Sequence, residues 1–255
     1  MLSVLIINYN TYIETINCIK SIIDSNLGNL KYEIIVLENN SKKNIYKFKK
    51  DNIKIWPLGK NYGFSKAINY GISKSSYEYI LSVNPDVTVC KNSIIKILSY
   101  FKDNDNSGVI GPKVLNQDLT YQYSSRRKFP YLNYIFFKFF LLDKIGFKST
   151  YNYIDIPDDM TSKVDSVSGC FFLTSKDVIK KIGLFDENFF LYFEDTDFCL
   201  RAKENGYDVI YYPESCVVHK KFASRNLKNY LFVKFHFFKS FFKFYMKYRS
   251  YYLRY

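Results

Sequence analysis

The sequence predicts an α/β fold in which helices flank a mostly parallel central sheet, with a basic aromatic helix at the C-terminal end. The run Ser3–Asn8 is apolar and β-branched without polar alternation, which is typical of a strand buried on both faces. Thr11–Ser25 follows with apolar side chains at helical spacing, and Tyr32–Ser41 is a second apolar run that ends in polar residues. This β-α-β opening predicts that ligands bind at the carboxyl ends of the strands.

The first predicted helix begins with a possible capping box, because Thr11 precedes it and Glu14 stands three residues later. Strands and helices then keep alternating as far as residue 115. We expect strands at Ile53–Gly59, Tyr77–Val87 and Ser107–Leu115, and helices at Phe64–Ser75 and Lys91–Asn104.

The regular pattern breaks between Asn116 and Lys163. Arg126 and Arg127 lie in a stretch that is typical of a loop, and the aromatic block Tyr131–Leu142 predicts a short helix or a surface flap. Regular elements then return. We expect a strand at Val164–Ser175, a helix at Lys176–Gly183, a helix that stops at Gly206 and a strand at Tyr207–His219.

The net charge is +13, and it is concentrated at the C-terminal end, because no Asp or Glu follows Glu214. A basic surface suits nucleic acid, anionic lipid or phosphorylated ligands. Between Asn226 and Tyr255, lysines punctuate an aromatic background, which predicts an amphipathic helix lying on an anionic membrane surface. The alternative is a helix that packs on the core with its lysines solvated.

The five cysteines are widely spaced and form no C-x-x-C pair, which favours reduced thiols in a cytosolic setting. The chain starts without the basic segment of a secretory signal. The longest apolar stretch, Phe129–Leu142, carries Lys138 and is shorter than the ~20 residues that a membrane span needs. We therefore expect a cytoplasmic protein that is soluble or peripheral to the membrane.

The usual phosphate-binding motifs are missing. No G-x-G-x-x-G follows the first strand, and Gly59-Lys60 is followed by Asn61 rather than Ser or Thr, which disfavours a dinucleotide dehydrogenase and a P-loop ATPase. A nucleotide ligand would then need a divalent metal held by carboxylates. Asp86 is a candidate, because Pro85 stiffens the turn that presents it after a buried strand; the alternative is an ordinary Asn-Pro-Asp turn.

Three carboxylates, Glu194, Asp195 and Asp197, follow the aromatic run Phe189–Phe193. They could simply begin a helix, where acidic side chains oppose the positive end of the dipole. Burial beside aromatic rings is costly for a carboxylate unless it meets a cation, a metal or a function, so we favour a functional role. His219, at a strand end, is a possible metal or phosphate ligand or a plain surface residue.

These motifs together resemble the family 2 inverting glycosyltransferases, which have a Rossmann-like GT-A fold, and in particular the rhamnosyltransferase-like branch of bacterial O-antigen and capsule biosynthesis. The matching stretches come in the family's order: Val4–Thr11, Leu37–Ser41, Asn61–Ile72, Asn84–Val87, Ser168–Tyr207 and Val217–His219. The resemblance implies a glycosyltransferase domain over residues 1–219, with a nucleotide-sugar half (1–115), an acceptor-side insertion (116–165) and a catalytic-base half (166–219). Residues 220–255 form the basic aromatic tail.

The resemblance also implies roles for single residues. Asp195 matches the catalytic base, with Glu194 and Asp197 as its support. Asp86 matches the last acidic residue of the family's D-x-D motif, and with His219 it would hold Mg²⁺ or Mn²⁺ on the donor diphosphate. The other nucleotide-sugar contacts are implied for Tyr9, Glu38, Asn39, Asn61, Gly63 and Asn84. At Glu38 this sequence departs from the family's more usual Asp.

The implied reaction moves a sugar, with inversion, from a dTDP- or UDP-linked donor to a hydroxyl of a growing, lipid-linked cell-surface polysaccharide. Such a transfer needs one general base for the hydroxyl and positive charge for the leaving diphosphate. Two alternatives remain open. A nucleic-acid-binding protein would explain the basic tail but not the carboxylates, which repel phosphate, so we expect no nucleic-acid partner. An inactive GT-A scaffold would not need Asp86, Asp195 and His219.

Overall fold

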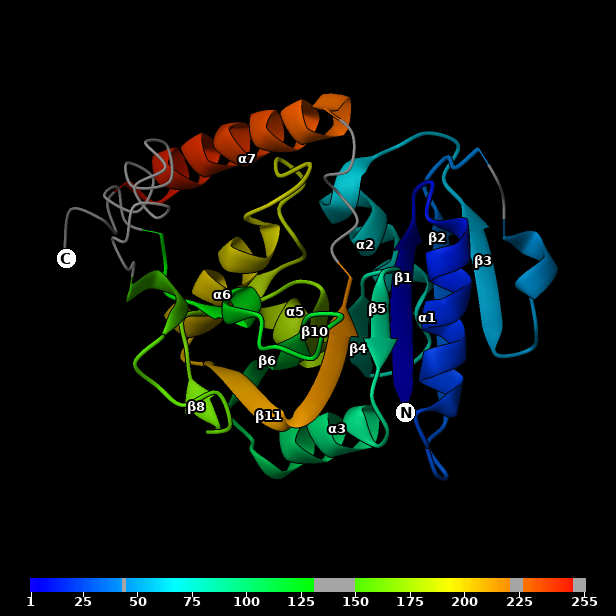
Figure 1. Ribbon diagram of the computed structural model, residues 1–255, viewed down its shortest axis with the longest axis horizontal. Helices are drawn as coiled ribbons and strands as arrows, with labels where there is room; N and C mark the ends of the chain where they lie inside the picture. Colours follow the sequence, from blue (N-terminus) through cyan, green and yellow to red (C-terminus); the bar gives the residue numbers. More distant parts are fainter. Residues whose placement is uncertain (43–44, 131–149, 221–226, 250–255) are drawn as a thin grey trace.

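The computed structural model describes residues 1–42, 45–130, 150–220 and 227–249. A nine-stranded central sheet runs through these residues in the order β3-β2-β1-β4-β10-β6-β11-β5, with β8 paired to β11 (Figure 1). The strands are β1 Leu2–Asn8, β2 Tyr32–Glu38, β3 Ile53–Pro57, β4 Tyr79–Val83, β5 Val87–Val89, β6 Ser107–Leu115, β8 Ser162–Lys163, β10 Phe171–Ser175 and β11 Asp208–His219.

Most strands run in one direction. β3, β2, β1 and β4 are parallel neighbours, and β6 and β11 are parallel to each other. Because β10 is antiparallel to both β4 and β6, the two parallel groups point the same way. Their carboxyl ends therefore meet at one edge of the sheet, as the opening β-α-β pattern predicts.

Helices cover both faces of the sheet (Figure 1). α1 (Tyr12–Asp24) and α3 (Ser93–Asp103) lie on one face, and α2 (Gly63–Lys74), α5 (Lys176–Ile182) and α6 (Glu194–Glu204) lie on the other. α1 shows why the sequence folds in this way, since Thr15, Cys18, Ile19 and Ile22 recur at helical spacing and are buried. The expected mostly parallel sheet with flanking helices is confirmed.

The C-terminal helix α7 (Leu227–Lys247) packs on the rest of the chain through a second apolar cluster, separate from the main core. Phe241 and Phe244 of α7, and Tyr248 just after it, meet side chains of the segment before α6 and of α6 itself, including Phe193 and Leu200. The rings of Phe193 and Phe244 lie 5.6 Å apart. The described residues also include three short 3₁₀ helices, η1 Tyr46–Phe48, η2 Tyr123–Ser125 and η4 Thr150–Asn152.

The predicted strand Tyr77–Val87 is in fact two strands. β4 ends at Val83, the chain turns with a bond from the Val87 amide to the Asn84 carbonyl (3.2 Å), and β5 then pairs antiparallel with β11. Pro85 explains the break, because it has no amide hydrogen to continue a ladder.

Two other expectations were wrong in detail. The capping box does not form: Thr11 makes no side-chain cap to α1, because its hydroxyl donates to Asn8 Oδ1 (3.0 Å) instead. Arg126–Arg127 is not a loop but strand β7, which pairs with β9 (Ser166–Val167) in a separate two-stranded sheet. The aromatic block Tyr131–Leu142 lies outside the described residues.

Candidate active site

The carboxyl ends of β1 and β2 bring the first predicted donor contacts together. Asn8 and Glu38 are register partners, and Asn8 Nδ2 donates to Glu38 Oε2 (2.7 Å). The amide of Ser41 donates to the other oxygen of Glu38 (3.1 Å), so this carboxylate is buried and held at both oxygens. Tyr9 follows β1 and is 45% exposed, which leaves its ring free to stack on a ligand.

Asn39, Asn61 and Gly63 form one hydrogen-bonded loop beside these residues. Asn39 Nδ2 donates to Asn61 Oδ1 (3.0 Å), which also accepts from the Gly63 amide (2.9 Å). Gly63 has a φ of +76°, and a Cβ there would lie 2.5 Å from the Phe190 carbonyl oxygen. The site therefore needs glycine at this position, and Phe190 links the loop to the second half of the chain.

Asp86 and His219 form an ion pair between the ends of β4 and β11. Val87, the first residue of β5, lies opposite His219, and His219 Nε2 is 3.2 Å from Asp86 Oδ1. Burial alone would lower the pKa of His219, but Cys170 and Asp86 raise that pKa to about 10. The Asp86 carboxylate therefore favours the protonated imidazole.

A divalent metal would find two protein ligands here. Carboxylate oxygen and imidazole nitrogen suit Mn²⁺, and Mg²⁺ is commonly held by one or two carboxylates together with substrate phosphates. No group of three or more His, Cys, Asp or Glu that could hold a metal occurs within residues 1–42, 45–130, 150–220 and 227–249. The Asp86–His219 pair thus fits a metal shared with a diphosphate, and coordination through His219 requires the loss of its proton.

Asp195, the predicted base, lies in the first turn of α6 and is only 7% exposed. Its Oδ2 accepts from Arg127 Nη2 (2.6 Å) and from the Gly169 amide (2.9 Å). Its Oδ1 accepts from the amide (2.7 Å) and the hydroxyl (3.2 Å) of Thr196. Arg127 thus balances the buried charge. Among its neighbours Gly169 is notable, because a Cβ there would lie 3.2 Å from Asp195 Cβ.

Two aromatic residues in a strained conformation lead into α6. Tyr192 and Phe193 both have a φ of +68°, a region that bulky side chains rarely adopt. Phe193 is held there by the rings of Phe237, Phe241 and Phe244 on α7. Strain of this kind persists only where the surroundings fix it, and here it sets the start of α6 and hence the place of Asp195.

Glu194 and Asp197 differ although both flank Asp195. Glu194 is buried, its Oε2 has no hydrogen-bond partner within the described residues, and burial together with Asp195 raises its pKa to about 8. Asp197 is fully buried and points to the tail instead: Oδ2 accepts from Arg201 Nε (2.9 Å), and Oδ1 from Lys247 Nζ (2.6 Å) and Tyr248 Oη (2.7 Å). Asp197 therefore anchors α7.

The turn Ser168–Cys170, between β9 and β10, joins the two groups of predicted residues. The Gly169 amide donates to Asp195, and the next carbonyl, that of Cys170, accepts from the Asn84 amide (2.8 Å). Cys170 also lies against His219, whose pKa it raises. Asn84 follows β4, so one short turn connects the predicted base with the Asn84–Asp86 segment.

Comparison with known proteins gives the family. Residues 3–183 match the family described as "Glycosyl transferase family 2", and residues 120–248 match "Glycosyl transferase family group 2". This chain belongs to glycosyl transferase family 2. The family resemblance noted in the sequence motifs is thereby confirmed.

Several curated relatives of this family 2 chain are glycosyltransferases by name. It is 30% identical over 165 residues to the dTDP-rhamnosyl transferase RfbF of Shigella flexneri, a match that covers 64% of this chain and 50% of RfbF. It is 26% identical over 214 residues to the low-salt glycan biosynthesis hexosyltransferase Agl10 of Haloferax volcanii, covering 82% of this chain and 63% of Agl10. The chain thus spans about half to two thirds of the length of these two relatives.

Solved structures show that the family 2 chain has the GT-A fold. GalNAc-T7, crystallised with UDP, GalNAc and Mn²⁺, superposes with a TM-score of 0.63 at 17% identity, covering 91% of this chain and 47% of that one. Residues 1–349 of TarS from S. aureus superpose with a TM-score of 0.60 at 16% identity, covering 86% and 60%. The fold expected from the sequence is confirmed.

Sequence reasoning missed Arg127 as a partner of Asp195 in this family 2 site. The two residues are 68 positions apart and belong to different elements, so no local pattern connects them. A weak signal was available, since three neighbouring carboxylates in an apolar setting require a cation and Arg126–Arg127 was the unassigned basic pair. Arg126 itself is 1% exposed and binds backbone carbonyls such as that of Pro157 (3.1 Å).

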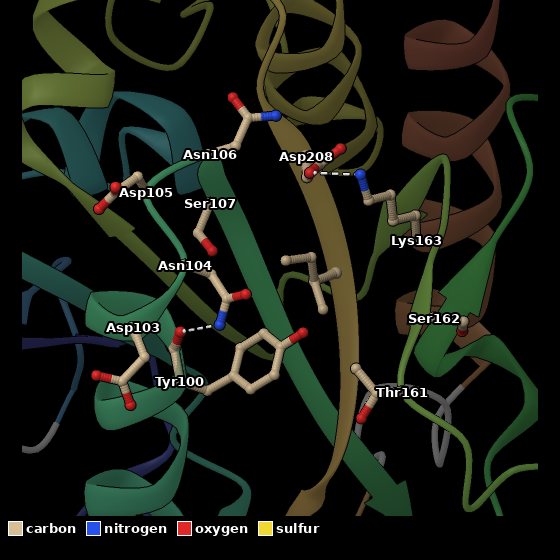
Figure 2. A pocket seen from close by; sticks show the side chains of 11 residues that line it. Tyr100, Asp103, Asn104, Asp105, Asn106, Ser107, Thr161, Ser162, Lys163 and Asp208 are labelled. Carbon is tan, nitrogen blue, oxygen red and sulfur yellow. Dashed lines mark hydrogen bonds and ion pairs between the residues drawn. The ribbon is translucent and has the colours of Figure 1, made fainter.

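A cavity of about 550 Å³ lies away from this site (Figure 2). Its lining includes Ser107 and Asp208, the first residues of β6 and β11, and so it opens at the amino ends of the parallel strands. Figure 2 shows Lys163 paired with Asp208 at its rim (2.8 Å). The predicted contacts lie at the opposite edge of the sheet, so this cavity is not their pocket.

None of the described helices combines the length and the apolar character that crossing a membrane requires. α7 is 21 residues long, but lysines interrupt its apolar surface.

Proposed function

We propose that this chain transfers a sugar, with inversion, from a nucleoside-diphosphate sugar to a hydroxyl of a growing, lipid-linked cell-surface polysaccharide such as an O-antigen or capsule. The observation that carries the proposal is the turn Ser168–Cys170, which links Asp195 to the segment Asn84–Asp86 at the carboxyl edge of the sheet. A base and a diphosphate site at one edge are what a single displacement needs.

In this proposal Asp195 accepts the proton of the attacking hydroxyl. The leaving nucleoside diphosphate gains negative charge as its bond to the sugar breaks, and Asp86 and His219 would hold Mg²⁺ or Mn²⁺ against it. The metal, when bound, supplies positive charge to the departing phosphate. Glu38, Asn39 and Tyr9 would bind the nucleobase and ribose of the donor. Asn61, Gly63 and Asn84 would lie below its diphosphate and sugar.

The donor is proposed to be a dTDP- or UDP-linked hexose. Support comes from relatives, among which is a dTDP-rhamnosyl transferase in Shigella flexneri. A second is the poly-beta-1,6-N-acetyl-D-glucosamine synthase of Staphylococcus epidermidis, 25% identical over 190 residues, in a match covering 72% of this chain and 41% of the synthase. The first name is that of a dTDP-sugar transferase, and the second is that of a polysaccharide synthase.

The donor is best identified by a thermal-shift screen of dTDP- and UDP-sugars, each with Mn²⁺ and with EDTA. We expect one donor to raise the melting temperature by several degrees with Mn²⁺ and much less with EDTA, since a bound ligand stabilises by RT ln(1 + [L]/Kd). The Asp86→Ala variant should lose the metal-dependent part of the shift. Equal shifts with and without EDTA would remove the metal from the proposal, and no shift with any donor would count against the transferase function.

We also propose that α7 places the enzyme on the inner face of the cell membrane, where a lipid-linked acceptor would lie. Leu231, Phe235, Phe242 and Met246 are four or seven residues apart, form one face of α7 and are 52–63% exposed. Exposed Lys234 and Lys239 flank this face. The opposite face packs on the protein, as the packing alternative expects, and the exposed face supports the membrane proposal.

Flotation with vesicles tests the membrane proposal. Vesicles with ~30% phosphatidylglycerol should carry the wild-type protein at low salt, and Phe235→Ser with Phe242→Ser should weaken this at least tenfold. Leu119→Ser is the matched control, because Leu119 is 66% exposed but lies far from α7 in the chain. Equal flotation of the double variant and the wild type would exclude α7 as the contact.

A further inference from the structure

We propose that Arg127 holds Asp195 in the substrate-free protein and leaves it for a phosphate group of the bound substrate. The inference rests on the proposed function, because it takes Asp195 as the group that accepts the acceptor's proton. The inference also assigns a role to the two-stranded sheet β7–β9. That sheet fixes the backbone of Arg127, so that only the side chain has to move.

Asp195 has no free position for an acceptor hydroxyl as the structure stands. An ionised carboxylate offers about four lone-pair positions. All four are taken, two by Arg127 Nη2 and the Gly169 amide at Oδ2, and two by the amide and hydroxyl of Thr196 at Oδ1. A substrate hydroxyl can donate to Asp195 only when one of these partners withdraws.

Arg127 is the partner best able to withdraw. The amides of Gly169 and Thr196 belong to the backbone and are held in place by it. Thr196 is only 1% exposed, so its hydroxyl is enclosed and has no solvent to turn toward. The Arg127 side chain is long and 19% exposed, and it binds Asp195 through a single nitrogen. A rotation of this side chain would uncover Oδ2 without disturbing α6.

Arg127 is also incompletely bonded where it lies. Its Nη2 is shared between Asp195 and the Val167 carbonyl (3.1 Å), and its Nε is buried without a hydrogen-bond partner among the described residues. Arginine commonly binds an oxyanion through two parallel N–H groups, and Arg127 does not bind Asp195 in this way. A phosphate could accept from both Nε and Nη2. The proposed reaction offers two sources of such a phosphate, the diphosphate of the donor and the lipid diphosphate of the acceptor.

The exchange would open the base only when substrate is bound. While Arg127 is paired with Asp195, its N–H group occupies a position at Oδ2 that the acceptor hydroxyl needs. When Arg127 moves to phosphate, that position becomes free as the hydroxyl arrives. The other titratable groups around Asp195 are Glu194 and Cys199 on α6 and Tyr151 of η4, which stay in place in either state.

The split between KM and kcat separates this role from a permanent structural pair. If Arg127 binds substrate phosphate, Arg127→Gln should raise the KM of the substrate that carries this phosphate at least tenfold, because the variant lacks the guanidinium that binds it. Lys163→Gln, which removes one cation from a 73% exposed side chain in strand β8, should leave KM unchanged. A fall in kcat with every KM unchanged would indicate a permanent pair and would overturn the inference.

Binding of phosphate probes tests the same inference without any turnover. In calorimetry with saturating UDP, Arg127→Gln and Arg127→Lys should weaken geranyl diphosphate at least tenfold if the acceptor supplies the phosphate. If the donor supplies it, the same variants should instead weaken UDP itself at least tenfold. Unchanged affinity for both probes in folded variants would overturn the inference. A wild-type protein that transfers no sugar from any donor would remove the proposed function, while these binding results would still decide whether Arg127 takes phosphate.

Discussion

The proposed donor side and the proposed base side of the site are held in different ways. On the donor side, apart from the Asp86–His219 pair, side-chain amides hold their neighbours: Asn8 donates to Glu38, and Asn39 donates to Asn61. On the base side, cations hold carboxylates, with Arg127 on Asp195 and both Arg201 and Lys247 on Asp197. Hydrogen bonds from neutral amides keep a shape without a cation, whereas a charged ligand can compete for either member of an ion pair.

This difference suggests that the donor side is preformed and that the base side is assembled by its substrate. The two carboxylates of the base side also differ from each other. Asp197 is fully enclosed by α6 and α7, while Asp195 faces a side chain that can leave. In our proposal Asp197 therefore serves stability and Asp195 serves chemistry, and substitutions can separate the two roles.

Asp195→Asn should have the largest effect. A positioned general base contributes about 10²–10⁴ in rate, so transfer should fall by that factor while the donor-induced thermal shift persists. The amide keeps the hydrogen bonds to Thr196, which should preserve the fold. Asp208→Asn, at the other edge of the sheet, is the control and should retain activity. Full turnover by Asp195→Asn would exclude Asp195 as the base.

Gly63→Ala tests whether the donor side is preformed. A methyl group there would meet the Phe190 carbonyl at 2.5 Å and would also occupy a left-handed φ, for a combined loss of about 2–4 kcal/mol in unfolding free energy. Gly59→Ala is a close control, because Gly59 has a φ of +77° and nothing within 4 Å of the added Cβ. Equal losses measured by urea unfolding would mean that the Phe190 contact is unimportant.

Asp197→Asn should destabilise the protein by roughly 2–3 kcal/mol, somewhat less than a fully buried broken pair, because Lys247 is 34% exposed. Asp186→Asn removes only the second carboxylate that binds Lys247. The Asp186 carboxylate is 19% exposed, so this variant should lose less unfolding free energy than Asp197→Asn. Chemical unfolding of both variants gives the comparison. A larger loss in Asp186→Asn would contradict the view that Asp197 is the main anchor of α7.

Glu194→Gln should have little effect near pH 5, and its effect should grow as the pH rises. The folded-state pKa of Glu194, about 8, lies above the ordinary value of 4.5, so the folded protein binds an extra proton between these values and loses stability as pH rises through them. Glutamine removes this loss. The advantage of the variant should grow by at most about 1.4 kcal/mol per pH unit from pH 5 to pH 8.

Melting curves at several pH values measure this trend. Glu204→Gln, near the exposed end of α6, controls for the loss of one carboxylate from the same helix. If the stability difference between Glu194→Gln and the wild type stayed constant with pH, Glu194 would not be held protonated by its surroundings.

Sequence patterns predicted the elements that depend on local periodicity. β1, α1 and β2 follow from apolar runs and helical spacing, and the parallel order places Glu38 and Asp86 at one edge. Contacts between distant segments were not predictable in this way. Arg127 meets Asp195 across 68 positions, and Tyr248 meets Asp197 across 51. Such pairs depend on how elements pack, and the carboxylates alone could not reveal which cation each would find.

The stereochemistry of transfer tests the central claim most directly. With the donor found by thermal shift, the anomeric configuration of the product can be read by NMR. A single displacement assisted by one base, Asp195, predicts a product whose anomeric configuration is opposite to that of the donor sugar. A product with the donor's configuration would require a second displacement or another mechanism, and it would contradict the account.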